Sequence, residues 1–177
     1  MFKRLATVMA VAALTGGGVA TGAVSADAAP VHNTATSAAS SAAALSGGSI
    51  CYQAHVQKYG WQSIVCDGDV AGTTGQSLRL EALEIGVSGT GTVCAQAHVQ
   101  KLGWQDVECT SGGSDIVIGT TGQSLAIQAV YLWRADGISA NAHLHGTGWQ
   151  GWKTGSDITV GTTGESRPME AIEITVP

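Results

Sequence analysis

Phenylalanine is almost absent from this sequence, and aromatic residues of all kinds make up only 5% of it. The single phenylalanine, Phe2, lies in an apolar N-terminal stretch, so the rest of the chain relies on five tryptophans and three tyrosines. Large buried rings contribute strongly to the stability of a core. We therefore expect the tryptophans to supply most of the aromatic packing.

Charged residues are also scarce, at 12% of the chain, and the formal net charge is −5. A chain with this charge is repelled by nucleic-acid phosphates and by anionic membrane surfaces. We therefore predict that neither nucleic acid nor a membrane surface is a partner.

Only one apolar stretch approaches the length of about 20 residues that a membrane span needs. It follows Lys3 and Arg4, ends at about Val24, and precedes the small-residue sequence Ala-Asp-Ala at 26–28. This order is typical of a secretory signal peptide. We predict a signal peptide at 1–28, a secreted protein and no membrane span after processing. A retained N-terminal anchor is the alternative.

Residues 29–48 are rich in alanine, serine and threonine, carry no charge and show no steady period. Such a composition is typical of a flexible linker. We therefore predict a tether ahead of one folded domain at 49–177, with a processed propeptide as the alternative.

Three copies of one pattern fill the domain, at residues 50–87, 93–133 and 138–176. The copies contain CYQAHVQKYGWQSIVC, CAQAHVQKLGWQDVEC and SANAHLHGTGWQGWKT, and each continues with a GTTG tetrapeptide. Short β-branched and aliphatic runs lie between Gly-rich turns, with no helical period, which predicts an all-β fold. Three repeats can close around a pseudo-threefold axis. We favour a β-prism, because each repeat looks like one small sheet, and keep a β-trefoil as the alternative.

The pattern AHVQ-x-x-GWQ followed by AGTTGQ-x-LRLEA resembles the clostridial hydrophobic tryptophan (ChW) repeat of secreted Gram-positive bacterial proteins. The resemblance covers essentially all of residues 50–176. Repeat two departs from it with Gln128, where the other repeats have a glutamate, and repeat three departs with Arg-Pro-Met at 167–169. The resemblance implies an extracellular module with suggested roles in polysaccharide binding or cell-surface contact. It implies no catalytic residues.

The four cysteines allow three disulfide pairings. In repeat three both equivalent positions are replaced together, by Ser139 and Thr154, as expected if the two positions bond each other within a repeat. Export to an oxidising compartment supports the same interpretation. Free buried thiols are the alternative. The predicted disulfides are Cys51–Cys66 and Cys94–Cys109.

A disulfide between Cys51 and Cys66 implies a hairpin in which Val56 faces Trp61, His55 faces Gln62, and residues 57–60 form the turn. Strand alternation then puts the tryptophan and the histidine on opposite faces.

The repeat tryptophans have two possible roles, stacking on sugar rings or filling the core. We favour the core, because a small alanine accompanies each ring on its predicted face and aromatic residues are scarce elsewhere. These residues are Trp61, Trp104 and Trp149.

Each repeat also pairs a histidine with a glutamine on the other predicted face. A ring nitrogen and an amide suit sugar hydroxyls, so we predict these pairs as the ligand-binding set. A buried polar pair that fixes the hairpin register is the alternative. The residues are His55, Gln62, His98, Gln105, His143 and Gln150.

Glu81 and Glu170 lie in predicted strands where alternation places them with core residues such as Leu83 and Ile174. A partly buried carboxylate needs a polar partner, either the repeat histidine or the amides of a GTTG loop. We list both glutamates as possible ligand or core residues.

Patterns that carry catalysis are missing: the sequence has no nucleophile elbow, no local metal-ligand spacing and no phosphate-binding loop. We weighed a metal site formed by the three repeat histidines and set it aside. We predict no enzyme activity, no cofactor and no metal.

The leading hypothesis is a secreted, multivalent, lectin-like module for extracellular or cell-wall polysaccharide. The alternatives are contact with surface proteins in adhesion, or a structural secreted protein.

Overall fold

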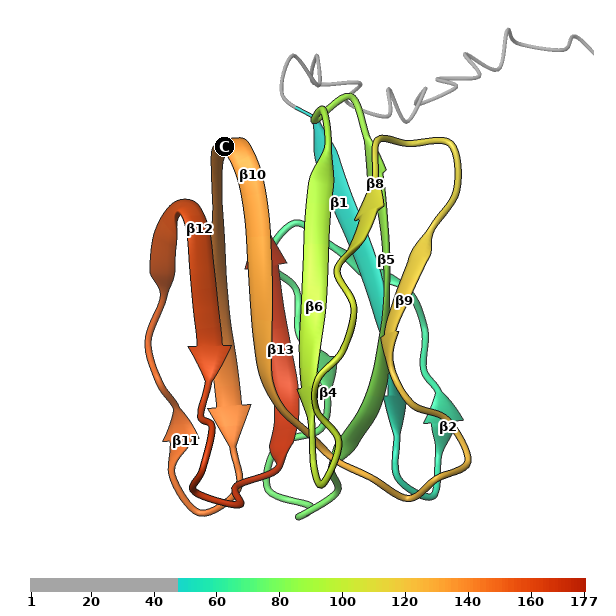
Figure 1. Cartoon of the computed structure of the whole chain (residues 1–177), viewed down its shortest axis with the longest axis vertical. Helices are drawn as coiled ribbons and strands as arrows, with labels where there is room; N and C mark the ends of the chain where they lie inside the picture. Colours follow the sequence, from blue (N-terminus) through green and yellow to red (C-terminus); the bar gives the residue numbers. More distant parts are fainter. Residues whose placement is uncertain (1–47) are drawn as a thin grey trace, which may run out of the picture. The chain divides into compact units, whose positions relative to one another are not determined.

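The computed structural model describes residues 48–177 (Figure 1). The predicted signal peptide and residues 29–47 of the predicted tether lie outside this range. Every regular element of the described part is a β-strand, which confirms the all-β prediction. None of the described residues forms a helix of the length and apolar character that crossing a membrane requires.

Repeat one contains five strands. The long strand β1 pairs on one side with the return strands β2 and β3 and on the other with β5. The strands are β1 (Ser49–Val56), β2 (Gly60–Trp61), β3 (Val65–Cys66), β4 (Ala71–Gly72) and β5 (Leu80–Ser88).

Repeats two and three follow the same plan and share one long strand, β10, which ends repeat two and begins repeat three. The strands are β6 (Val93–Val99), β7 (Gly103–Trp104), β8 (Glu108–Thr110), β9 (Ile116–Gly119), β10 (Ile127–Leu144), β11 (Gly148–Trp149), β12 (Lys153–Gly161) and β13 (Met169–Thr175). The continuity of β10 merges the last two repeats into one sheet, so the fold has two sheets.

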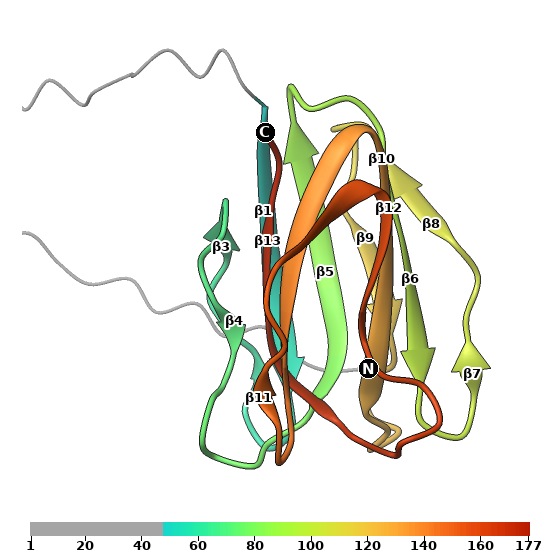
Figure 2. The ribbon, with the colours of Figure 1, turned by 90° about the vertical axis from the view of Figure 1, so that its left-hand side faces the viewer.

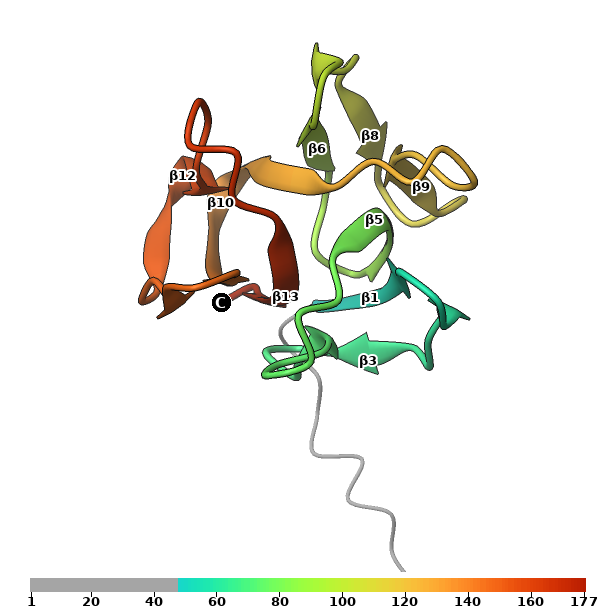
Figure 3. The same cartoon turned by 90° about the horizontal axis from the view of Figure 1, so that it is seen from below.

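The strand before each GTTG sequence pairs with the last long strand of another repeat. Strand β9 pairs with β5, β12 with the first half of β10, and β4 with β13. The last of these pairs joins repeat one to repeat three, so the three repeats surround a common centre (Figure 3). The choice between a β-prism and a β-trefoil stays a prediction.

The long strands alternate buried and partly exposed residues. The buried residues are mostly aliphatic and form the core. In β1 the buried residues are Ile50, Tyr52, Ala54 and Val56. The Tyr52 hydroxyl donates a hydrogen bond to the carbonyl of Asp69 and accepts one from the Ile174 amide at 2.8 Å. Burial raises the pKa of Tyr52 to about 12. This side chain therefore connects the first strand of the domain to the last.

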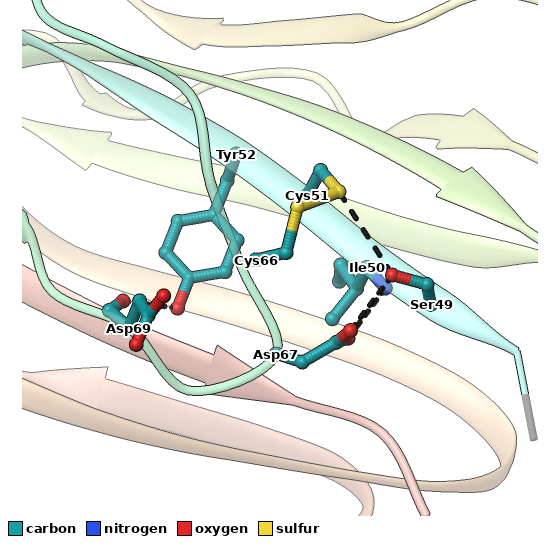
Figure 4. Close-up of a disulfide and its surroundings, with 7 residues drawn as sticks. All are labelled: Ser49, Ile50, Cys51, Tyr52, Cys66, Asp67 and Asp69. Carbon is teal, nitrogen blue, oxygen red and sulfur yellow. Dashed lines mark hydrogen bonds between the residues drawn. A yellow bond between two sulfur atoms is a disulfide. The ribbon is translucent and has the colours of Figure 1, made fainter. Parts of the chain in front are cut away.

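Both predicted disulfides are present, Cys51–Cys66 (Figure 4) and Cys94–Cys109. In repeat three the hydroxyls of Ser139 and Thr154 lie 2.8 Å apart at the equivalent position. A hydrogen bond therefore replaces the covalent link where both cysteines are lost.

The predicted hairpin register is correct at the disulfide and wrong by one residue at the turn. Cys51 is opposite Cys66, but His55 is opposite Trp61 and Val56 is opposite Gly60. Between these pairs the return strand has one more residue than β1. The same offset occurs in repeats two and three. Because of this extra residue, the tryptophan lies on the histidine face.

Candidate functional site

Each repeat places its tryptophan edge-on against its histidine. The ring centroids are 5.3 Å apart for His55 and Trp61, and 5.2 Å apart in the pairs His98–Trp104 and His143–Trp149. The rings are close to perpendicular in all three pairs. The same contact therefore recurs three times.

The prediction that the tryptophans fill the core is wrong. Trp61, Trp104 and Trp149 are 40%, 42% and 37% exposed. The core cluster of the described domain is made of Tyr52 with aliphatic residues such as Leu83 and Ile174, and it leaves the rings outside. The physical reason is the extra residue in the return strand, which reverses the face on which the ring lies.

The three pairs gather at one end of the domain. Strands β2 and β11, which carry Trp61 and Trp149, lie at the lower end in Figure 1. Strand β7, which carries Trp104, lies toward the same end as β11 in Figure 2. The three strands that carry the tryptophans therefore lie at the same end of the domain.

A β-bulge brings the residue at the Glu81 position to the histidine. His55 is opposite Ala82 and Val56 is opposite Leu80, which leaves Glu81 without a partner in β1. Gln128 and Glu170 are the corresponding residues in the other repeats. The expectation that both glutamates share the face of the core residues is wrong, because a bulge interrupts the alternation.

In repeat one the buried carboxylate of Glu81 has two basic neighbours. His55 Nδ1 lies 3.3 Å from Glu81, and Arg79 donates hydrogen bonds from Nε at 3.1 Å and Nη2 at 2.7 Å. A buried carboxylate is tolerated only when its charge is compensated. The histidine is thus the partner that the sequence suggested, and Arg79 is a second one that it did not.

Repeat three compensates its glutamate differently. Pro168 takes the place of Arg79, and the second basic group is His145, whose Nδ1 lies 2.7 Å from Glu170. His143 Nδ1 lies 3.3 Å from the other carboxylate oxygen. In both repeats the glutamate therefore has a histidine and one further basic side chain.

Repeat two has no charge to compensate. The bulge residue is the neutral Gln128, and Ala126 stands in place of the arginine. The buried His98 Nδ1 has no hydrogen-bond partner among residues 48–177, and the same holds for His55 Nδ1 and His143 Nδ1, which lie near their glutamates without a hydrogen bond. The tryptophan–histidine contact is therefore kept with a neutral residue behind it.

The glutamines predicted to bind ligand with the histidines have a structural role in each repeat. The side-chain oxygens of Gln62, Gln105 and Gln150 accept hydrogen bonds from the first amide of the GTTG sequence of the same repeat, at 3.0, 2.8 and 2.8 Å. The ligand role of these glutamines stays a prediction, and the structure brings the tryptophan to the histidine in each repeat.

Each site is assembled from two repeats. The carbonyl of Glu81 accepts a hydrogen bond from Thr120 in the next GTTG sequence, at 2.8 Å. A Cβ on Gly119 would lie 2.5 Å from that carbonyl oxygen, and its φ is +91°. The first glycine of the loop is therefore required for the loop to approach the bulge. Thr162 and Thr73 bond Gln128 and Glu170 in the same way.

No three His, Cys, Asp or Glu side chains in the described domain are arranged to hold a metal ion. The recurring group is an exposed indole, a histidine and a bulge residue, with a backbone loop behind them. This arrangement offers an apolar ring face beside a polar ring, which is suited to binding.

The family model described as "Clostridial hydrophobic W" matches residues 55–89, 98–133 and 143–177. The chain belongs to this family. Each match begins at the repeat histidine, so each ChW unit contains its tryptophan, its GTTG sequence and its bulge residue. No curated protein and no solved structure matches the chain.

Sequence reasoning missed the second basic residue of two ChW repeats, Arg79 and His145. Both lie in the sequence near the glutamate or the histidine that they support. The available signal was their joint absence from repeat two, where the glutamate is also absent.

Proposed function

We propose that this protein is a secreted binding module, and not an enzyme, that recognises extracellular carbohydrate at its three tryptophan–histidine sites. The observation that carries the proposal is an indole ring exposed at the same place in every repeat and fixed there by a histidine. A rigid aromatic side chain left at the surface is a common feature of binding sites.

The chemistry of each site suits a pyranose ring. The indole face packs against the apolar C–H face of a sugar, and the histidine beside it supplies a polar atom for a hydroxyl. In repeats one and three Nδ1 points at a glutamate, so Nε2 is the nitrogen left for a ligand. One such site binds weakly, and three sites on one polymer bind much more strongly together.

The proposed location rests on two further features. Disulfides persist in oxidising surroundings and are rare in the reducing cytosol. Each disulfide joins a cysteine inside a ChW match, Cys66 or Cys109, to a cysteine just before that match. The disulfides and the ChW repeats are consistent with an extracellular location. Extracellular or cell-wall polysaccharide is therefore the ligand that we propose.

The test is a glycan array, followed by pull-down of the intact chain on insoluble polysaccharide. The triple variant Trp61→Ala, Trp104→Ala, Trp149→Ala should lose binding, and each single variant should lose part of it. A matched control is Trp152→Ala, which removes an exposed tryptophan that belongs to none of the three tryptophan–histidine pairs. Binding by the triple variant at the level of the parent chain would refute the proposal.

Contact with a surface protein is the second candidate function. Apolar residues two positions before Trp61 and Trp104 favour it, because Tyr59 and Leu102 are 60% and 54% exposed. Interface centres are often aromatic and aliphatic. A blank glycan array, together with a protein partner that the triple tryptophan variant fails to capture, would decide for this candidate.

A further inference from the structure

A cleft with a volume of about 230 Å³ lies on the outer face of the repeat-one sheet, away from the tryptophan–histidine contact. Its wall contains the Cys51–Cys66 link, Ile64 and Val87, and its polar groups include Gln53, Glu84 and Asp115. A cavity of this size holds one ring or one side chain. Apolar walls with a few placed polar groups are typical of small ligand sites.

Gly86 opens this cleft. The corresponding residue of repeat two is Trp133, which is opposite Cys94 as Gly86 is opposite Cys51. In repeat three the corresponding residue is Thr175. Repeat two therefore places an aromatic ring of its own beside the disulfide, at the register position where repeat one has no side chain.

Two carboxylates line the opening. Glu84 accepts a hydrogen bond from Gln53. The Asp115 carboxylate lies over Gly86, because a Cβ on Gly86 would lie 2.3 Å from Asp115 Oδ1. Within residues 48–177 neither carboxylate forms an ion pair with a lysine, arginine or histidine. The cleft thus combines apolar walls with two negative charges that a bound cation would neutralise.

We infer that this cleft binds one unacetylated amino-sugar ring of a glycan, with the ammonium group at Glu84 and Asp115 and the ring against Ile64 and the disulfide. The inference rests on the proposed carbohydrate function and adds a cationic sugar to it. A ring fits because the cleft has a volume of about 230 Å³ and apolar walls. A cation fits because a hydrogen bond from a charged donor to a carboxylate is stronger than a hydrogen bond between neutral groups.

The experiment is calorimetric titration of the intact chain, at mildly acidic pH, with a glucosamine oligomer, its N-acetylated counterpart and a glucose oligomer. The glucosamine oligomer should bind at least about tenfold more tightly than the other two, the effect of one charge-assisted hydrogen bond. Glu84→Gln and Asp115→Asn should each remove most of this preference.

The matched control is Glu173→Gln, because Glu173 holds the same place in repeat three and accepts a hydrogen bond from Asn141 at 3.0 Å. This variant should keep the preference. Gly86→Trp, which copies repeat two, should abolish it. Gly86 has an ordinary φ, and the atoms that a Cβ there would meet belong to the exposed Asp115 side chain. A melting curve checks that this variant folds.

Equal binding of the three oligomers would overturn the inference, and so would a preference that survives Glu84→Gln. If the triple tryptophan variant still loses glycan binding in that case, the proposed function stands without the cleft. If a lysine peptide binds in an Asp115-dependent manner and the glucosamine oligomer does not, the ligand is a protein side chain and the inference is wrong.

Discussion

Repeats one and three reach the same geometry with different chemistry. Repeat one closes its hairpin with a disulfide and compensates Glu81 with Arg79, whereas repeat three uses a serine–threonine hydrogen bond and His145. The edge-on tryptophan, the bulge and the loop contact are the same in both. The hairpin cross-link and the second basic side chain can therefore be replaced by other groups. The exposed tryptophan and its histidine are present in all three repeats.

The largest expected effect comes from exchanging the cross-links. Replacing Cys51 with serine and Cys66 with threonine copies repeat three into repeat one, and should lower the free energy of unfolding by about 3 kcal/mol, because a cross-link limits the unfolded chain. The reference is Ser139→Ala, which removes one exposed hydrogen bond and should cost about 1 kcal/mol or less. Urea denaturation measures both. Equal losses would show that the two links stabilise their hairpins alike.

The second test concerns the buried charge of repeat one. Arg79→Ala leaves Glu81 with only a histidine and should cost about 2 kcal/mol, less than for a fully buried pair because the arginine is partly exposed. Adding Glu81→Gln copies repeat two and should recover most of the loss, since no charge then needs compensation. Urea denaturation of the two single variants and the double variant measures the coupling. Additive losses would contradict the compensation account.

These supporting groups also mark how far the sequence could be interpreted. Three repeats, an all-β fold and both disulfides followed from self-similarity, turn residues and the joint loss of two cysteines. The site did not, because one extra residue near Gln62 and one bulge at Glu81 each reverse the face of a side chain. The alternation of residues along one strand cannot predict such irregularities, because they depend on how that strand pairs with other strands.

A pH titration separates repeat one from the other two at a single position. Tyr52 corresponds to Ala95 and Ala140, so only repeat one carries a phenol in the core. Its pKa is raised from 10.0 to about 12 by burial, so the folded state holds the proton more tightly than the unfolded state. The stability is therefore fully present below pH 10 and is lost as the pH rises through 12.

The expected loss across this window is on the order of 2–3 kcal/mol, from about 1.4 kcal/mol for each pKa unit. Thermal melts between neutral and high pH measure it. Tyr52→Phe should be less stable at neutral pH, because it removes two hydrogen bonds, but should lose less on going to high pH. A parallel decline in both chains would assign the pH dependence to other groups.

The smallest expected effect compares the outer face with the core, and it decides whether the rings serve stability or binding. Trp61→Ala should cost only about 1 kcal/mol, because the ring is largely at the surface and loses one edge-on contact with His55. Leu83→Ala, a fully buried position of the same repeat, should cost about 3 kcal/mol. Under conditions in which both variants are folded, Trp61→Ala should nevertheless lose more glycan binding than Leu83→Ala. A Trp61→Ala loss of unfolding free energy as large as that of Leu83→Ala would mean that the ring supports the fold, and the carbohydrate proposal would then lose the observation that carries it.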